Sequence, residues 1–536
     1  MASASTLWLC AAAVKLLLWP SYHSTDFEVH RNWLAVTRST PASRWYADTE
    51  GQSEWTLDYP PLFAAFEAAL AAVAQRVDEG IIDAQRRGYA PPTCVLFQRA
   101  TVVVTEFVVL RSGVGFATRG CTAPQRRAAH VIFCGAGLAS LVVVDHVHFQ
   151  YNGMLLGLLA WLLGLLREER WHCAAAVFCA MLTMKHLFLS LAPCVAAVLA
   201  GAIFARRSAR LLASLAATTA AALAAGLAPL AVPAFLGRGG VEGVAAALAE
   251  LLRRLFPFEA RGLMHSYWAP NAWALYATAD RAALKVLGSA ARAGSGAGTT
   301  RGRVDAGAGF LAVLPSPTPA ICAALSLAAM APALYALFAM RHPRGAGAAA
   351  AAQRHRVVLA SFAHAALSAF LFGWHVHEKF LLVALVPLAL LAVEARDRAD
   401  VDVFRHAARL ATFAALPLLP ASELPLKVLL VAVEECTLPA ALLDAPGGDA
   451  CCAAPPVSRG GARRALESLH VLALAALFAL KELAYPLLLS PEREAALEFL
   501  PLMLISAYGG AVATALWLVS AARLSRDIAA CGAGAR

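Results

Sequence analysis

The sequence predicts an all-α, polytopic membrane protein, and three observations support this fold class. Apolar residues make up 60% of the 536 residues and charged residues only 15%, against about 25% in an ordinary soluble domain. Apolar runs long enough to cross a bilayer recur along the chain. Arg residues concentrate in short segments between these runs, as expected of cytoplasmic loops. Soluble, disordered, fibrous and disulfide-rich classes are therefore excluded.

The apolar runs predict about 11–14 transmembrane helices. The first run, near residues 3–20, has neither a charged n-region nor a small-residue cleavage site. We therefore expect a retained first helix at 1–20 rather than a signal peptide. Further runs lie near 93–111, 128–145, 153–167, 172–204 (broken at Pro193), 210–236, 319–340, 356–373, 379–394, 403–419, 465–486 and 497–522.

Basic residues in the short loops set the orientation. Four Arg-containing loops, within 111–127, 167–170, 206–210 and 341–356, are assigned to the cytoplasmic side. The alternation of sides is consistent only if residues 61–77, which contain Glu67 and Arg76, do not cross the membrane. We then expect one shared site on the opposite face, formed by the polar segments 21–60, 145–152, 185–192, 237–270 and 374–379.

The first of these segments carries a candidate catalytic acid. Thr25 followed by Glu28 fits a capping box, which predicts a helix that begins at Asp26. On that helix Asp26, His30 and Trp33 share one face. Asp26 is either a first-turn acid favoured by the helix dipole or a general base that accepts a proton from a sugar hydroxyl. Because the dipole lowers the pKa of such an acid, a working base needs compensating burial.

The stretch 55–61 ends this segment with two prolines, which forbid helix before them and favour a helix start. Asp58 is therefore expected to cap a helix over 61–77 or, together with Tyr59, to line a sugar pocket. Lys185 and His186 interrupt an apolar stretch. Lys185 either extends to the membrane surface or meets a lipid-linked phosphate at membrane depth.

Three further segments combine polar and aromatic side chains. In 145–153, the acid, histidines and amides indicate either an interfacial loop or, less well, a metal site without a second carboxylate. In 256–271, Arg261 is a candidate bidentate phosphate ligand and Trp268 a candidate belt residue. In 373–379, two histidines and Glu378 lack a further metal ligand. These residues are therefore expected to bind a charged substrate group, with Lys379 opposite phosphate, and no metal is expected.

Other catalytic signatures are missing from the sequence. It contains no P-loop and no G-x-S-x-G motif, and its D-x-D motif, Asp400 to Asp402, falls in a segment assigned to the cytoplasmic side. An enzyme that uses a metal-bridged nucleotide sugar is therefore disfavoured. A secondary transporter is a second alternative class, but it should show an internal repeat, which the sequence lacks.

Four blocks, 24–33, 57–62, 148–152 and 375–379, together resemble one family. It is the dolichyl-phosphate-glucose-dependent α-1,3-glucosyltransferases of the endoplasmic reticulum (ER), which build the lipid-linked oligosaccharide for N-glycosylation. The resemblance runs from about residue 18 to 395. The block Thr-Asp-Phe-Glu-Val-His-Arg-Asn-Trp, at 25–33, is similar to the branch that adds the second glucose. The branch that adds the first glucose has Gly before the Asp and His before the Trp.

The resemblance implies a GT-C glycosyltransferase fold with a luminal active site bearing short juxtamembrane helices. It divides the chain into a first helix (1–20), a luminal catalytic loop (21–92), a transmembrane core (93–395) and C-terminal helices (396–536). Residues 286–318 and 436–464 are variable inserts without an assigned role. A protein mannosyltransferase shares the early Asp but not the four blocks together.

The implied donor is dolichyl phosphate glucose, and the implied acceptor is Glc1Man9GlcNAc2 on dolichyl diphosphate. The alternative acceptor is Man9GlcNAc2, used by the first-glucose branch. ER membrane lipid is a further partner, and neither a cofactor nor nucleic acid is expected. The family inverts the anomeric configuration, so one carboxylate deprotonates the acceptor hydroxyl, and Asp26 carries over as that base. The substrate-binding residues expected from the polar clusters and the resemblance are Glu28, His30, Arg31, Trp33, Asp58, Tyr59, His146, His148, Gln150, Asn152, Lys185, His186, Arg261, Trp268, His375, His377, Glu378 and Lys379.

Overall fold

The computed structural model describes residues 3–47, 55–237, 239–258, 261–265, 268–287, 311–340, 347–395, 398–443, 457–490, 497 and 499–533. Within them the chain is helical, apart from connections and one isolated bridge between Met264 and Val376. Most of 286–318 and the centre of 436–464, predicted as inserts, lie outside the described residues.

Eight helical segments in the described chain are long and apolar enough to cross a membrane: 92–117, 123–147, 186–206, 209–237, 319–339, 350–372, 467–488 and 500–529. Three shorter apolar helices accompany them: α1 (Ala4–Leu17), α8 (Asn152–Arg167) and α9 (Trp171–Met184). The prediction of an all-α, multi-pass membrane protein is confirmed. Helix α3 (Pro61–Val77) belongs to neither group, and the same holds for the predicted spans 379–394 and 403–419. Whether α3 crosses the membrane, and the number of spans, stay predictions.

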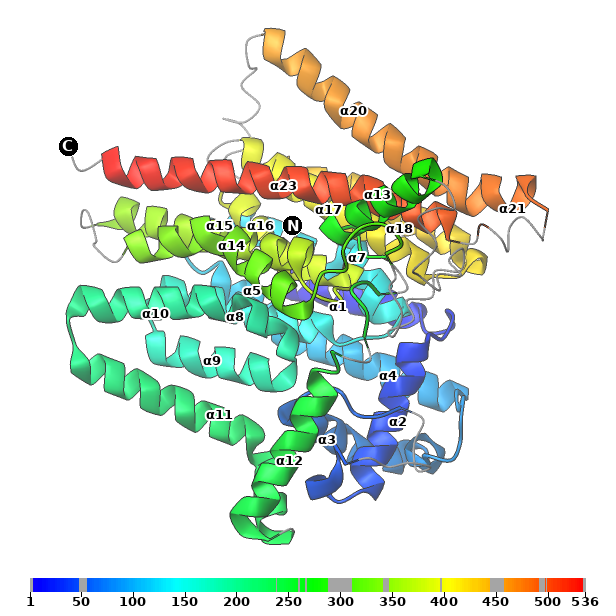
Figure 1. Ribbon diagram of the computed structural model, residues 1–536, viewed down its shortest axis with the longest axis vertical. Helices are drawn as coiled ribbons and strands as arrows, with labels where there is room; N and C mark the ends of the chain where they lie inside the picture. Colours follow the sequence, from blue (N-terminus) through cyan, green and yellow to red (C-terminus); the bar gives the residue numbers. More distant parts are fainter. Residues whose placement is uncertain are drawn as a thin grey trace.

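The axes of the long helices are roughly aligned, and helices joined by short connections run in opposite chain directions (Figure 1). Helices α10 (Ala192–Arg206), α11 (Ala209–Gly237), α14 (Pro319–Ala339), α15 (Ala348–Phe372) and α23 (Leu500–Ala533) run in nearly the same direction across the view. Helix α15 packs between α14, α23 and α16 (Leu381–Val393), and α9 packs against α8 and α11. Further helices of the described chain are α4 (Pro92–Thr105), α5 (Arg111–Ala117), α6 (Ala123–Val131), α13 (Ala272–Leu287), α17 (Arg398–Ala415), α18 (Leu424–Leu443) and α20 (Val457–Ala479).

Helices in the lower part of Figure 1 run steeply across the direction of the bundle. Among them are α2 (Thr25–Ser39), which packs on α3, and α12 (Gly240–Leu255), which follows α11. The connection between α10 and α11, with its Arg residues, and the C-terminus lie at the left end of Figure 1, away from α2. This separation is the arrangement expected if the Arg loops and the polar segments face opposite sides of the membrane.

Wide π-helical turns interrupt two of the predicted spans at Glu106–Leu110 and Val142–Val147. Glu106 and His146 lie on these turns, 2.5 Å apart, and Lys15 of α1 pairs with the same glutamate. All three side chains are buried. Since an unpaired charge at membrane depth is expensive, this cluster is stable because its members satisfy one another. His146, predicted as a substrate-binding residue, is engaged here.

The predicted break at Pro193 is wrong, because the run 172–204 breaks at Lys185 instead. Lys185 has an extended backbone, with φ −151° and ψ 115°, and separates α9 from the 3₁₀ turn His186–Leu191 that leads into α10. Pro193 lies in the first turn of α10, where its missing N–H leaves no helical bond unmade. The turn therefore places Lys185 at the junction of two helices.

Gly157 lets α8 pack against the neighbouring π-helical turn, and we expect Gly157→Ala to destabilise the protein. A Cβ at this position would lie 2.6 Å from backbone atoms of Val109 and Leu110. Overpacking of this kind costs about 1–3 kcal/mol, so the thermal midpoint of the detergent-solubilised protein should fall. Gly115→Ala is the matched control, because its nearest atom lies 3.9 Å away on the His130 ring. Equal midpoints for the two variants would contradict this packing.

Candidate active site

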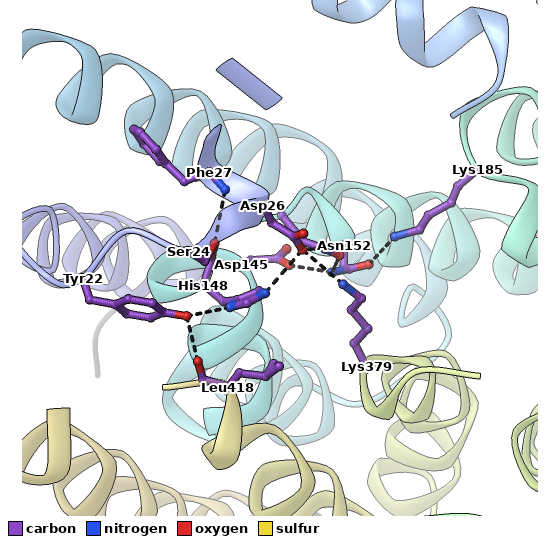
Figure 2. A network of polar contacts seen from close by, with 11 residues as sticks. Tyr22, Ser24, Asp26, Phe27, Asp145, His148, Asn152, Lys185, Lys379 and Leu418 are labelled. Atoms are coloured by element: carbon purple, nitrogen blue, oxygen red, sulfur yellow. Dashed lines mark hydrogen bonds and ion pairs between the residues drawn. The ribbon is translucent and has the colours of Figure 1, made fainter. Parts of the chain in front are cut away.

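Asp26 lies in the first turn of α2, at the centre of polar side chains that come from distant parts of the chain (Figure 2). The predicted capping box is not formed: the helix begins at Thr25, one residue earlier than predicted, with Ser24 as the N-cap, and the Ser24 Oγ accepts a hydrogen bond from the Phe27 N–H at 3.2 Å. Glu28 pairs with Arg31 at 2.7 Å rather than turning back to the cap. The Ser24 hydroxyl also donates to the His148 carbonyl, which fixes the start of α2 against the 145–152 segment.

Three side chains converge on the Asp26 carboxylate. Lys379 Nζ lies 3.2 Å from Oδ2, and His148 Nε2 lies 3.4 Å from the same oxygen. The Gln150 amide also donates to Oδ2. The Asp26 side chain is 28% exposed, so the carboxylate is reachable as well as enclosed. The predicted convergence of 21–60, 145–152 and 374–379 around Asp26 is present in the structure.

These partners control the charge of Asp26. Burial alone would raise the pKa of Asp26, but the Lys379 ammonium, followed by hydrogen bonds from His148 and Gln150, holds the pKa well below its usual value. The carboxylate is therefore ionised and can accept a proton. A proton acceptor held at such a low pKa is a weak base until one of these partners is drawn away.

Tyr22 orients the His148 ring toward Asp26. Its hydroxyl donates to the Leu418 carbonyl oxygen at 2.7 Å and lies 2.9 Å from His148 Nδ1. The other ring nitrogen, Nε2, then faces Asp26 (Figure 2). Tyr22 lies in the polar segment 21–60, but neither it nor Leu418 was predicted as a site residue, because aromatic and apolar residues are common near membrane surfaces.

A second chain of hydrogen bonds joins Asp145 to Lys185 (Figure 2). The Asn152 amide donates to Asp145 Oδ1 at 2.9 Å and to Gln150 Oε1 at 3.0 Å. Its oxygen accepts from Lys185 Nζ at 3.0 Å. Because Gln150 in turn donates to Asp26, the amides of Gln150 and Asn152 connect the carboxylate to the lysine.

Lys185 is buried and points into the site, so the alternative that it extends to the membrane surface is wrong. Its Nζ lies 4.9 Å from the centre of the Tyr59 ring, close enough for a cation–π contact. Burial lowers the pKa of Lys185 to about 7, and the Lys379 ammonium acts in the same direction. Two cations thus share this site, and a bound anion would stabilise both.

Asp58 pairs with Arg261 at 2.9 Å, and it does not cap α3 as one interpretation predicted. Pro60 is the N-cap residue of α3 and no side chain caps the helix. Both members of the pair are about one-third exposed, so the ion pair contributes little stability. It joins the stretch before α3 to the segment after α12.

Lys379 and Glu378 occupy a short 3₁₀ turn, Glu378–Phe380, ahead of α16. Burial alone would lower the pKa of Lys379, but Asp26 and then Glu378 raise it above its usual value, so the amine is charged. Glu378 is buried, and neither carboxylate oxygen has a hydrogen-bond partner among the described residues. Burial raises its pKa. An unsatisfied carboxyl group beside Asp26 is unusual outside functional sites.

Histidines gather at the same wall of the site. Nitrogen atoms of His265, His375 and His377 all lie within 4.8 Å of one another. Burial is the main cause that lowers the pKa of each, and that of His265 falls to about 3. The charges of Lys379 and Asp26 act on both His265 and His377. The histidine cluster is therefore close enough to this ion pair to interact with it electrostatically. Sequence reasoning missed His265, because nothing in the local spacing links it to 375–377.

Arg99 of α4 was also missed, although it holds the site together. Its buried guanidinium donates to the carbonyl oxygens of Leu18, Tyr22 and His146 at 2.6, 2.9 and 3.0 Å. It also reaches the carbonyl oxygens of Ser21 and Val147. One side chain therefore joins the peptide before α2 to the end of the 123–147 span. The signal in the sequence was an Arg inside an apolar run.

Several predicted substrate-binding residues have structural contacts instead of contacts with Asp26. His30 bonds Glu67 at 2.7 Å, and its ring packs against Trp33. Arg31 donates to the carbonyl oxygens of Ile81 and Asp83. His186 packs its ring against Phe256, and Trp268 belongs to a small separate apolar cluster with Leu263, Met264 and Trp273. Their predicted contact with substrate stays a prediction.

The D-x-D motif has a structural role in the described chain. Asp400 is buried and pairs with Arg356 of α15 at 2.7 Å and with Arg523 of α23. The motif therefore joins three helices instead of presenting two free carboxylates.

Comparison with known proteins identifies the family of this chain. The model of the "ALG6, ALG8 glycosyltransferase family" matches residues 11–520, a range that contains every residue of the site. The chain belongs to the ALG6/ALG8 glycosyltransferase family. The predicted resemblance is therefore confirmed, and the protein is an α-helical, multi-pass membrane glycosyltransferase.

Individual members of the ALG6/ALG8 family match over most of their length. A protein of Schizosaccharomyces pombe is 35% identical, with 95% of this chain and 96% of the relative covered. One of Gibberella zeae is 38% identical (78% and 80% covered), and one of Mus musculus is 36% identical (80% of each). All three are named dolichyl pyrophosphate Glc1Man9GlcNAc2 alpha-1,3-glucosyltransferase.

Proposed function

We propose that this protein transfers glucose from dolichyl phosphate glucose to Glc1Man9GlcNAc2 on dolichyl diphosphate, in α-1,3 linkage, at the luminal face of the ER membrane. The observation that carries the proposal is the ionised Asp26 held between Lys379, His148 and Gln150 in a member of this family. The names of the relatives supply the acceptor and the linkage.

The arrangement suits an inverting transfer. Asp26 accepts the proton of the acceptor hydroxyl, whose oxygen attacks the anomeric carbon opposite the departing lipid phosphate. The proton remains on Asp26, and the bonding electrons leave with the phosphate oxygen. The Lys379 and Lys185 ammonium groups then stabilise the charge that develops on that phosphate. Because a lipid phosphate leaves as an anion, the reaction needs no acid to protonate it.

Donor binding would also prepare the base. In the absence of substrate, Lys379 forms an ion pair with Asp26, and the charge of Lys379 is a major cause of the low pKa of Asp26. A phosphate that draws the Lys379 ammonium toward itself weakens this pair, and the pKa of Asp26 then rises toward its usual value. The carboxylate thus becomes a stronger base only when the donor is in place.

The test is glucose transfer by the purified full-length protein in lipid nanodiscs, with dolichyl phosphate glucose and each of two acceptors. We expect one hexose to be added to Glc1Man9GlcNAc2-diphosphodolichol and at least about 100-fold less to the Man9 form, because a site built around a terminal glucose leaves polar groups unpaired without it. Mass spectrometry of the released glycans measures the gain.

Preference for the Man9 acceptor would place the protein in the first-glucose branch. Uptake of a solute into sealed vesicles without any transfer would favour the transporter alternative. A matched control uses dolichyl phosphate mannose as the donor, and equal transfer from that donor would contradict the proposed donor.

A further inference from the structure

Three histidines form a compact cluster beside Lys379. His265 lies on the segment that follows α12, whereas His375 and His377 precede the 3₁₀ turn that carries Lys379. The ring of His265 is 3.9 Å from that of His377 and 5.5 Å from that of His375, measured between centres. One nitrogen of each ring lies within 4.8 Å of the other two.

The backbone holds the two segments in register. The His375 N–H donates to the Leu263 carbonyl oxygen at 3.0 Å, and Met264 forms a bridge with Val376. His375 has a φ of 52°, in the left-handed region that residues other than glycine rarely adopt. Such strain persists only where the surrounding contacts impose it, and it concentrates at functional sites. The contacts between the two segments therefore fix the backbone at His375.

One ring nitrogen of His375, Nδ1, is already hydrogen-bonded to the backbone. Its Nδ1 lies 2.8 Å from the Gly262 carbonyl oxygen, to which it must donate because the carbonyl only accepts. The remaining nitrogen, Nε2, then carries a lone pair that can bind a metal ion. Histidines that bind metal almost always donate their second N–H to a carbonyl or carboxylate in this way.

Three imidazole ligands narrow the choice of metal ion. Mg²⁺ and Ca²⁺ prefer oxygen ligands, whereas Zn²⁺, Co²⁺, Ni²⁺ and Fe²⁺ accept imidazole nitrogen. Zinc sites that hold a water or substrate commonly use three protein ligands and leave a fourth position open. In such a site the ligand nitrogens lie about 3.3 Å apart. The observed spread therefore requires the rings of His265 and His377 to approach that of His375 by roughly 1.5 Å, which rotation of these two side chains would supply.

We propose that His265, His375 and His377 form a site for one divalent transition-metal ion, with Zn²⁺ as the preferred ion. His377 is two residues before Lys379, which pairs with Asp26, so the bound ion would lie near this pair. A cation bound there adds positive charge beside the leaving phosphate. That effect on transfer rests on the proposed function, whereas metal binding itself does not.

The experiment measures metal binding to the full-length protein, solubilised in detergent and dialysed first against a chelator and then against metal-free buffer. Co²⁺ serves as the probe, since a nitrogen-ligated tetrahedral site gives visible absorption. We expect one Co²⁺ per chain, displaced by Zn²⁺. His265→Ala and His377→Ala should each weaken binding by more than about tenfold, because even outer contacts to a metal site are worth 10–100-fold.

His172→Ala is the matched control, because His172 is exposed on α9 and bonded only to Ser214 among the described contacts. It should bind Co²⁺ as the wild type does. Size-exclusion profiles establish that each variant is folded. Wild-type protein that takes up less than about 0.1 Co²⁺ or Zn²⁺ per chain would overturn the site without any variant, and so would full binding by the His265→Ala/His377→Ala double variant.

Transfer assays on the same samples separate the two proposals. A chain that binds one metal ion through these histidines but transfers no glucose supports the site and contradicts the proposed function. A chain that transfers glucose from the expected donor while it binds no metal supports the proposed function and contradicts the site.

Discussion

Asp26→Asn should reduce the rate of glucose transfer by on the order of 10³-fold or more, while the protein stays folded and inserted in the membrane. General-base catalysis contributes about 10²–10⁴-fold, and an amide cannot accept the proton of the acceptor hydroxyl. The substitution keeps the shape of the side chain and its place at the start of α2. The measurement is kcat with both lipid substrates at saturating concentration.

Asp83→Asn provides the control for this prediction, because the Asp83 carboxylate is exposed and pairs only with Arg86 among the described ion pairs. It should leave kcat unchanged. Turnover by Asp26→Asn within tenfold of the wild type would show that another group takes the proton, and Glu378, with its unsatisfied carboxyl oxygens, would then be the next candidate.

Lys379→Met should lower kcat/KM by about 10²–10³-fold, the usual effect of removing one group that stabilises developing negative charge. The loss has a second signature in its pH dependence. The pKa of Asp26 is depressed in part by Lys379, so the wild-type base stays ionised as the pH falls below the usual carboxyl pKa of about 4. Without Lys379 the pKa of Asp26 rises, and the acid limb of the rate profile should move to higher pH.

Lys285→Met is the control, since Lys285 is exposed at the end of α13. Profiles of kcat/KM against pH, in the range where the solubilised enzyme remains folded, supply the comparison. A slower Lys379→Met enzyme with an unmoved acid limb would mean that Lys379 binds phosphate but does not control Asp26. An unchanged rate would remove Lys379 from the mechanism.

The fold class and the centre of the site were predictable from the sequence, because both depend on local signals. Apolar runs specify spans, and an ionisable residue such as Lys185 inside such a run is expensive enough to mark a site. Asp26, His148, Gln150 and Lys379 were all singled out, and the structure brings them together. Their meeting follows from the alternation of loops between the two faces.

Contacts between distant segments account for what the sequence did not predict. The capping motif fitted Thr25, but the start of α2 is fixed by a contact from Ser24 to His148, which no local pattern specifies. The two prolines at the start of α3 predicted the helix start correctly, but Asp58 forms an ion pair with Arg261 and does not cap the N-terminus of the helix. His265 joins the other histidines only through the bridge between 264 and 376.

The guanidinium of Arg99 has a consequence for how the enzyme moves. Because it holds the peptide at 18–22 and the end of the 123–147 span at once, the carboxylate and its imidazole neighbour travel as a single rigid body. Loss of Arg99 should therefore slow catalysis by releasing these two segments from each other.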